Sequence, residues 1–144
     1  MTVFIDADGC PVVNEAVNIC RKNSVECVII CDTSHEIYRD GAQTIVVEKG
    51  ADSADFKLVN MVGEGDIAIT QDYALAAMCL SRKCRVINQD GMEYTELNID
   101  SLLFSRYTSK KIRAAGGRLK GPKKREAFQT ENFVKKLKEM IEDV

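Results

Sequence analysis

Short runs of apolar residues alternate along the chain with longer segments in which apolar residues recur every third or fourth position. The short runs predict strands at residues 3–5, 25–31, 43–48, 66–70 and 84–87. The longer segments predict helices at residues 12–22, 53–62, 73–82, 99–112 and 130–141, the last of them capped by Thr130. This alternation favours an α/β fold with a mainly parallel sheet of about five strands and right-handed crossovers.

Acidic residues follow directly after the first predicted strand. Residues 3–5 end at Asp6 and Asp8, and Gly9 and Pro11 then permit a tight turn into a helix. In open α/β sheets, ligands bind in the crevice beyond the carboxyl ends of the strands. The two carboxylates are therefore predicted to face a binding site, although an Asp after a strand also commonly caps the next helix.

Further acidic residues occupy comparable places later in the chain. Asp72 follows the fourth strand, Asp90 follows the fifth, and Asp55 lies in the first turn of a helix for which Asp52 or Ser53 is the predicted N-cap. Carboxylates that converge at one sheet edge repel each other unless a hard cation joins them, and Mg²⁺ or Mn²⁺ is the natural choice. A metal held in this way supports phosphodiester hydrolysis by activating water and stabilising the leaving oxygen.

The formal net charge of −2 hides a strong separation of charge. Residues 106–138 contain twelve Lys or Arg residues and only two acids, which predicts either a surface that binds a polyanion or simply a solvated basic helix face. A basic glycine-rich loop lies within this region; Pro122 stands where a phosphate-binding P-loop has its lysine, so nucleoside triphosphate hydrolysis is not expected. The loop provides these candidate nucleic-acid-binding residues: Gly116, Gly117, Arg118, Lys120, Gly121, Lys123, Lys124 and Arg125.

Composition limits the classes of protein to be considered. With 144 residues, 45% of them hydrophobic and 29% charged, the chain is expected to form one globular domain over residues 1–144. It lacks an apolar run long enough to cross a membrane and a recognisable signal peptide, so a cytoplasmic protein is expected. The six cysteines are predicted to be reduced and mostly buried, and zinc is not expected because there is no Cys-x-x-Cys pair and only one histidine, His35.

Four segments together resemble the YaiI/YqxD family of uncharacterised bacterial proteins, and the resemblance covers almost the whole chain. They are FIDADGCPV at 4–12, GADSAD at 50–55, GDIAITQDYALA at 65–76 and GGRLKGP at 116–122. That family is similar in turn to PIN and NYN nuclease-like domains, which implies a three-layer α/β/α sandwich with C-terminal helices, a clustered acidic metal site, and RNA or single-stranded nucleic acid as partner. By this resemblance Asp6, Asp55 and Asp72 are the metal ligands, and Asp8, Asp52 and Asp90 are further candidates.

The resulting hypothesis is a Mg²⁺- or Mn²⁺-dependent nuclease-like domain that acts on or binds RNA, with Asp6, Asp8, Asp55 and Asp72 as catalytic residues. A haloacid-dehalogenase-type phosphatase is one alternative, because the Asp6-Ala7-Asp8-Gly9 segment resembles its nucleophile loop. Thr70 with Lys83 or Lys110 would then fill the other roles, although the Asp-Asp pair usual late in such chains is absent. A non-catalytic RNA-binding or regulatory protein is the other alternative.

Overall fold

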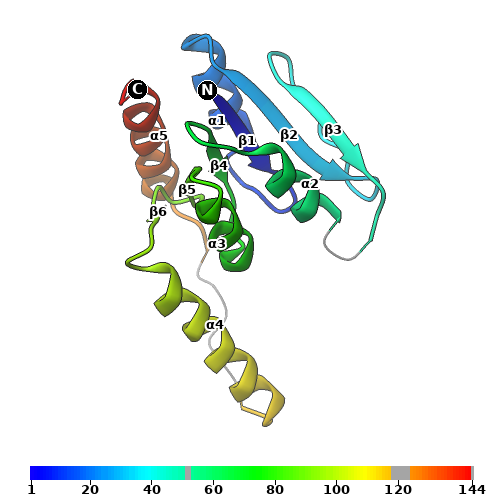
Figure 1. Ribbon diagram of the computed structural model, residues 1–144, viewed down its shortest axis with the longest axis vertical. Helices are drawn as coiled ribbons and strands as arrows, with labels where there is room; N and C mark the ends of the chain where they lie inside the picture. The colour runs from blue at the N-terminus through cyan, green and yellow to red at the C-terminus, as the bar shows by residue number, and fades with distance from the viewer. Residues whose placement is uncertain (51–52, 118–123, 144) are drawn as a thin grey trace.

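The computed structural model describes residues 1–50, 53–117 and 124–143, and within them six strands form one sheet (Figure 1). The strands are β1 (Thr2–Asp6), β2 (Glu26–Asp32), β3 (Gln43–Val47), β4 (Ile67–Ile69), β5 (Arg85–Ile87) and β6 (Glu93–Tyr94). Their order across the sheet is β3-β2-β1-β4-β5-β6; the first five run parallel and β6 runs antiparallel to β5. The five predicted strands are present, and β6 was missed because two residues are too few to show a pattern.

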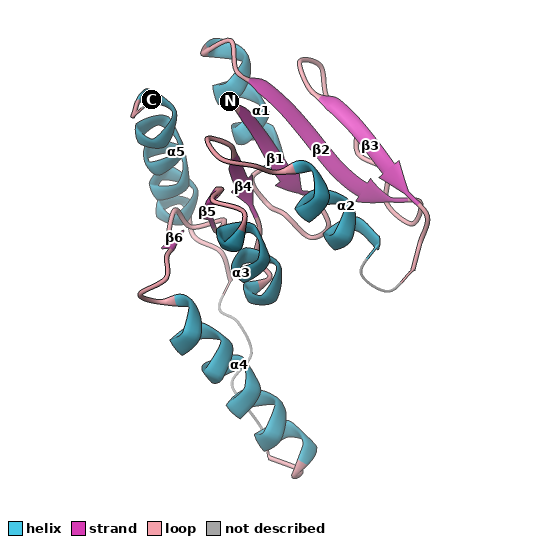
Figure 2. Ribbon diagram, in the orientation of Figure 1, coloured by secondary structure: helices cyan, strands magenta, loops and turns pink. Residues whose placement is uncertain are grey.

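Helices cover both faces of the sheet. They are α1 (Val13–Lys22), α2 (Ser53–Met61), α3 (Tyr73–Ser81), α4 (Ile99–Ala114) and α5 (Ala127–Glu142). Figures 1 and 2 show α2 and α3 in front of the sheet and α1 behind it. The predicted three-layer α/β/α arrangement is confirmed.

Alternate residues of the central strand serve the two layers. Val3 and Ile5 belong to the core formed with α1 and α5, whereas Phe4 belongs to the core formed with α2, α3 and the start of α4. This is the alternation expected of a parallel strand covered on both faces, in which both sets of side chains are apolar. Burial on both sides fixes the register of β1, and with it the position of the residue at its end.

The start of α5 differs from the prediction that Thr130 would cap it. The helix begins at Ala127, and the backbone N–H of Glu126 donates to Oε1 of Gln129 at 2.7 Å. Thr130 lies inside the first turns, where its hydroxyl accepts a hydrogen bond from Nε of Arg125 at 3.2 Å. The Glu-x-x-Gln pair satisfies the helix start, so the later threonine is not needed there. The proposed cap Asp52 lies outside the described residues.

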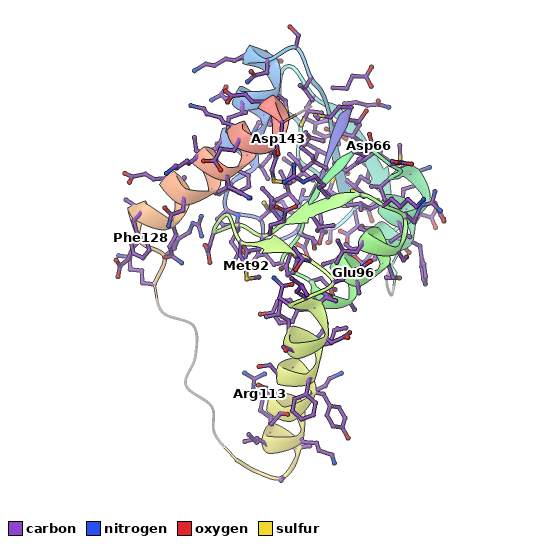
Figure 3. The ribbon with its side chains drawn as sticks, turned by 60° about the vertical axis from the view of Figure 1, so that its left-hand side comes forward. Asp66, Met92, Glu96, Arg113, Phe128 and Asp143 are labelled. Carbon is purple, nitrogen blue, oxygen red and sulfur yellow. The ribbon has the colours of Figure 1, made fainter. Side chains whose placement is uncertain are left out.

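Helix α4 departs from the compact part of the molecule. Its first turns pack through half-buried Leu102 and Leu103 beside α3, and from Phe104 to Ala114 every residue except Ser109 is exposed. Figures 1 and 3 show the helix projecting as an arm that carries Arg113 well away from the sheet.

All six cysteines are free thiols, and only Cys10 is not fully buried, as predicted. Among the described helices, none combines the length and the apolar character that crossing a membrane requires.

Candidate functional site

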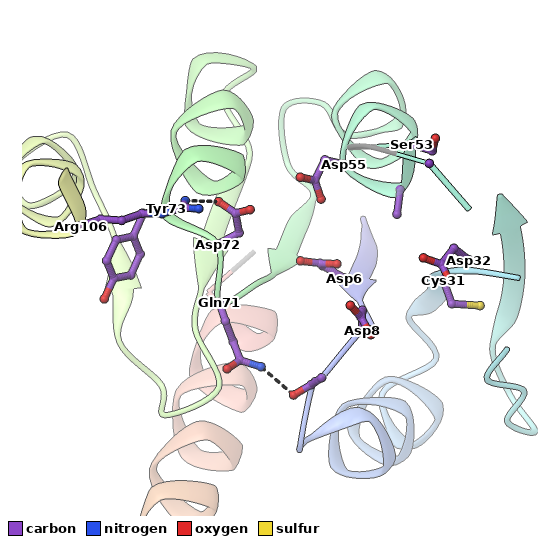
Figure 4. A pocket seen from close by; sticks show the side chains of 13 residues that line it. Asp6, Asp8, Cys31, Asp32, Ser53, Asp55, Gln71, Asp72, Tyr73 and Arg106 are labelled. Carbon is purple, nitrogen blue, oxygen red and sulfur yellow. Dashed lines mark hydrogen bonds and ion pairs between the residues drawn. The ribbon is translucent and has the colours of Figure 1, made fainter. Parts of the chain in front are cut away.

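The site lies where the strand order reverses. Strands β1 and β4 are neighbours in the sheet, although β1 is followed along the chain by β2, on its other side. The carboxyl ends of β1 and β4 therefore diverge into connections that leave in opposite directions, which opens a crevice for ligands at the switch point. A pocket of about 570 Å³ occupies this position, and its lining includes Asp6, Asp8, Asp32, Asp55, Asp72 and Arg106 (Figure 4).

Asp6 is the centre of the acidic group. It is the last residue of β1, and Figure 4 shows its carboxylate between those of Asp8 and Asp55. Burial raises the pKa of Asp6 from 3.8 to about 6; the hydrogen bond from Thr70 opposes this rise, and the charges of Asp55, Asp72 and Asp8 add to it. Acids from three separate segments of the chain thus meet in a single pocket, and their charges act on Asp6.

Thr70 connects the two central acids. It follows β4 directly and is 1% exposed; its hydroxyl donates to Oδ2 of Asp6 at 2.7 Å and accepts the backbone N–H of Asp72 at 3.0 Å. The hydroxyl of Tyr94 in β6 donates to the carbonyl oxygen of Thr70 at 3.2 Å. These contacts fix the orientation of the Asp6 carboxylate.

Asp72 combines a structural contact with an electrostatic one. As the N-cap of α3, its Oδ1 accepts the backbone N–H groups of Ala74 at 2.9 Å and Leu75 at 3.2 Å, which is the capping role that the sequence left open. Arg106 of α4 also donates from Nη1 to this Oδ1 at 3.3 Å. The side chain is therefore held at the pocket wall by two elements.

Two further predicted acids, Asp8 and Asp55, reach the pocket from a turn and a helix start. Asp8 is exposed on the turn after β1, and Asp55 lies half-buried in the first turn of α2, as predicted. The side chain of Gln71 donates from Nε2 to the carbonyl oxygen of Gly9 at 2.9 Å, which joins the loop after β4 to the loop after β1.

Two pocket residues were missed by the sequence analysis. Asp32 ends β2 and accepts hydrogen bonds from the backbone N–H and the hydroxyl of Ser34, which lower its pKa. Its signal was the one used for Asp6 and Asp72, an acid at a strand end. Arg106 carried no local signal for a place in the pocket, since it reaches Asp72 across 34 residues of sequence.

Asp90 does not join the acidic group. Its Oδ1 lies 2.5 Å from Nη1 of Arg125, and Arg125 also donates to the carbonyl oxygen of Gln89 at 2.7 Å. This ion pair ties the β5–β6 turn to the segment before α5. Arg125, a predicted nucleic-acid contact, therefore has structural partners.

Only some of the other predicted basic-loop residues are among those that the structure describes. Gly116 and Gly117 follow α4 and are exposed, as is Lys124. Lys83, considered for a phosphatase mechanism, precedes β5 and so lies at the sheet edge opposite the acids. The candidates that fall outside the described residues are Asp52, Arg118, Lys120, Gly121 and Lys123.

The carboxylate oxygens of the pocket are the type of ligand that a hard divalent cation prefers. Among the described residues, no three His, Cys, Asp or Glu side chains are arranged to hold one ion together. Mg²⁺, however, keeps several of its waters and commonly needs only one or two carboxylates from the protein. The pocket offers that number of carboxylates, since Asp55 and Asp72 line it together with Asp6 and their charges act on Asp6.

Comparisons with known proteins place the chain among bacterial proteins of unassigned activity. Residues 4–143 match a family model described as "Uncharacterized BCR, YaiI/YqxD family". A "UPF0178 protein" of Exiguobacterium sibiricum is 45% identical over 98% of this chain and 96% of its own length, and one of Ruminiclostridium cellulolyticum is 46% identical over 95% and 90%. A third, of Natranaerobius thermophilus, is 40% identical over 98% and 96%. No solved structure matches the chain.

Proposed function

The chain belongs to the YaiI/YqxD family, and from this premise and the acidic pocket we propose that it is a Mg²⁺- or Mn²⁺-dependent nuclease-like domain acting on RNA. The observation that carries the proposal is the convergence of Asp6, Asp55 and Asp72 on one pocket at the switch point of the sheet. These carboxylates come from the end of β1, the first turn of α2 and the N-cap of α3. Capping accounts for the place of Asp72 but not for that of Asp6 or Asp55. Burial raises the pKa of Asp6 and the neighbouring acids add to the rise, so a divalent cation at this carboxylate would offset the cost of its charge.

The pocket residues have separate roles in the proposed reaction. One or two of Asp6, Asp55 and Asp72 would hold the ion together with water, and Thr70 fixes the orientation of the Asp6 carboxylate. Asp8, exposed at the pocket edge, accepts the proton of the attacking water at its carboxylate. When bound, the metal lowers the pKa of that water and stabilises the charge on the leaving oxygen.

Metal binding is the first test. Isothermal titration with Mn²⁺ should show binding to the wild type and none to the double variant Asp6→Asn with Asp72→Asn. Asparagine still accepts at the α3 cap, so this variant is expected to fold, which circular dichroism checks. Asp40→Asn, the same change at an exposed turn outside the pocket, is the matched control and should bind like the wild type. Equal Mn²⁺ affinity in the double variant contradicts the proposal.

Substrate choice separates the proposal from a phosphatase. With Mn²⁺ present, the wild type should cleave a single-stranded oligoribonucleotide labelled at one end and leave a phosphomonoester intact. Release of phosphate from the monoester, without cleavage of the oligonucleotide, favours the phosphatase instead. Oligonucleotide binding without cleavage under any divalent ion favours the non-catalytic alternative.

The basic loop needs a test of its own. Changing Lys120, Lys123 and Lys124 to Gln removes three cations and leaves Arg125, which has structural partners, in place. If the loop contacts phosphates, the variant should bind RNA more weakly and the slope of log K against log salt should fall by about two to three. An unchanged slope removes the loop from the binding surface.

A further inference from the structure

We propose that the exposed stripe Phe104, Tyr107 and Lys111 on α4 is a stacking platform for single-stranded nucleic acid, which α4 leads past Arg106 to the acidic pocket. We call these three residues the α4 stripe. The binding of nucleic acid to α4 is inferred from the α4 surface itself. That the bound nucleic acid is a substrate rests on the proposed function. Single-stranded nucleic acid is thereby the substrate class.

The α4 stripe occupies one side of the helix. Its residues are three, four and seven positions apart, so their side chains lie one above another. Phe104 is 69% exposed and Tyr107 is 55% exposed, and Nζ of Lys111 lies 5.2 Å from the centroid of the Tyr107 ring. Two exposed aromatic rings thus lie together at the surface, with a cation over one face of Tyr107.

The helix does not use these rings to stabilise the fold. The contacts of α4 with the core come from Ile99, Leu102 and Leu103 in its first turns. Beyond them the helix projects into solvent, where Phe104 and Tyr107 contribute little buried area (Figure 1). Exposed aromatic residues grouped on one helix commonly mark an interaction site.

The charge of the arm identifies its partner as an anion. Between Phe104 and Ala114 the helix carries Arg106, Lys110, Lys111 and Arg113 and no acidic residue. Arg106 lies in the pocket lining and pairs with Asp72, so one cation of the arm stands at the acidic site. A strand that binds the arm and reaches Arg106 would have its backbone beside the carboxylates.

Single-stranded nucleic acid fits this surface better than the other occupants. It combines a negative backbone with free π faces, and stacking on aromatic side chains tolerates any base. In a duplex the π faces are already covered by neighbouring base pairs. A second copy of α4 packed against the stripe would have to bury Lys111 of both copies. The seven-residue span of the stripe is about 10 Å of helix, enough for about three bases stacked at roughly 3.4 Å.

Fluorescence anisotropy with a labelled single-stranded oligoribonucleotide in EDTA tests the platform apart from metal chemistry. The double variant Phe104→Ala with Tyr107→Ala should bind the single strand at least about tenfold more weakly than the wild type. The matched control exchanges the rings, Phe104→Tyr with Tyr107→Phe, and should bind like the wild type because both π faces remain. Both positions are exposed, so folding is expected to be intact, and circular dichroism checks this.

Three outcomes overturn the inference. The first is equal single-strand affinity in the alanine variant and the wild type. The second is an equal loss for single strand and for a duplex of the same sequence, which would mark the stripe as a general electrostatic surface. The third is a change in sedimentation from dimer to monomer with unchanged RNA affinity, which would assign the stripe to a second copy of the chain.

The two proposals fail separately. Loss of single-strand binding in the alanine variant supports the platform even if no divalent ion produces cleavage, in which case the nuclease proposal alone falls. Cleavage that depends on Asp6 and Asp72, with the alanine variant binding normally, keeps the nuclease and removes the platform.

Discussion

Replacing Asp6 by Asn should stabilise the protein at neutral pH in the absence of metal. Folding raises the pKa of Asp6 from 3.8 to about 6, chiefly by burial. Below pH 3.8 the carboxyl is protonated in both states, so its ionisation adds nothing to stability. As the pH rises toward 6, the unfolded chain ionises first, and the free energy of unfolding of the wild type falls. Above pH 6 the whole penalty is present, and at about 1.4 kcal/mol per pKa unit it amounts to about 3 kcal/mol.

Asparagine removes the charge and keeps the hydrogen bond. Its side-chain oxygen still accepts from the Thr70 hydroxyl, so the 2.7 Å contact at Oδ2 can be retained. Urea unfolding followed by circular dichroism in EDTA should show Asp6→Asn more stable than the wild type by up to about 3 kcal/mol at pH 7.5 and nearly equal to it at pH 4. The exposed control Asp40→Asn should match the wild type at pH 7.5.

Divalent ions should reverse the comparison. An ion that binds only the folded wild type adds about 4.1 kcal/mol when present at one thousand times its dissociation constant, which exceeds the penalty of about 3 kcal/mol, and the variant should gain far less. The reasoning is refuted if Asp6→Asn has the same stability difference from the wild type at pH 4 and at pH 7.5, because the effect would then not come from ionisation.

Three further changes test other parts of the structure by urea unfolding. Asp72→Ala removes the α3 cap and should lower the free energy of unfolding by about 1 kcal/mol, whereas Asp72→Asn should lower it less; equal losses would contradict the capping role. Gly91→Ala should lower the free energy of unfolding by more than about 2 kcal/mol, because φ is +85° and the new Cβ would lie 2.6 Å from the carbonyl oxygen of Asn132. Gly65→Ala is the control: φ is +88° but the space around it is open, so the loss should be only about 1 kcal/mol. Phe133→Ala, at a fully buried position between α5 and the sheet, should cost about 3–5 kcal/mol, and a loss below 1 kcal/mol would contradict the packing of α5.

The proximity of Asp6, Asp55 and Asp72 could be predicted from the sequence. Each stands at a strand end or a helix start, and in a parallel sheet those positions share one edge whatever the strand order. The order itself was not predicted, and it decides that β1 lies beside β4, so that Thr70 can bond to Asp6 across 64 residues of sequence. Such contacts depend on tertiary packing and leave no local pattern.

Asp90 shows that a local pattern can also predict a pocket residue wrongly when a tertiary contact holds it elsewhere. Its local pattern, an acid after a strand, matches that of Asp72, yet the pocket lining does not include it. The reason is Arg125, which arrives from 35 residues away and pairs with it at the β5–β6 turn. Strand-end acids are thus reliable guides to an edge of the sheet, whereas their partners decide which of them face the pocket.

The charges of the pocket determine an order of events for the proposed function. Among the described residues that line it are five aspartates and one arginine, Arg106, which already pairs with Asp72. A phosphate that approached this pocket without a metal would meet net negative charge and be repelled. A phosphate that approached the α4 arm, with its cations and exposed rings, would not be repelled in this way. On the proposed function, nucleic acid would therefore bind to the arm before the metal is present, and its backbone would enter the pocket only after a cation has offset the carboxylates. Removing divalent ions should then abolish cleavage while leaving binding on α4 intact.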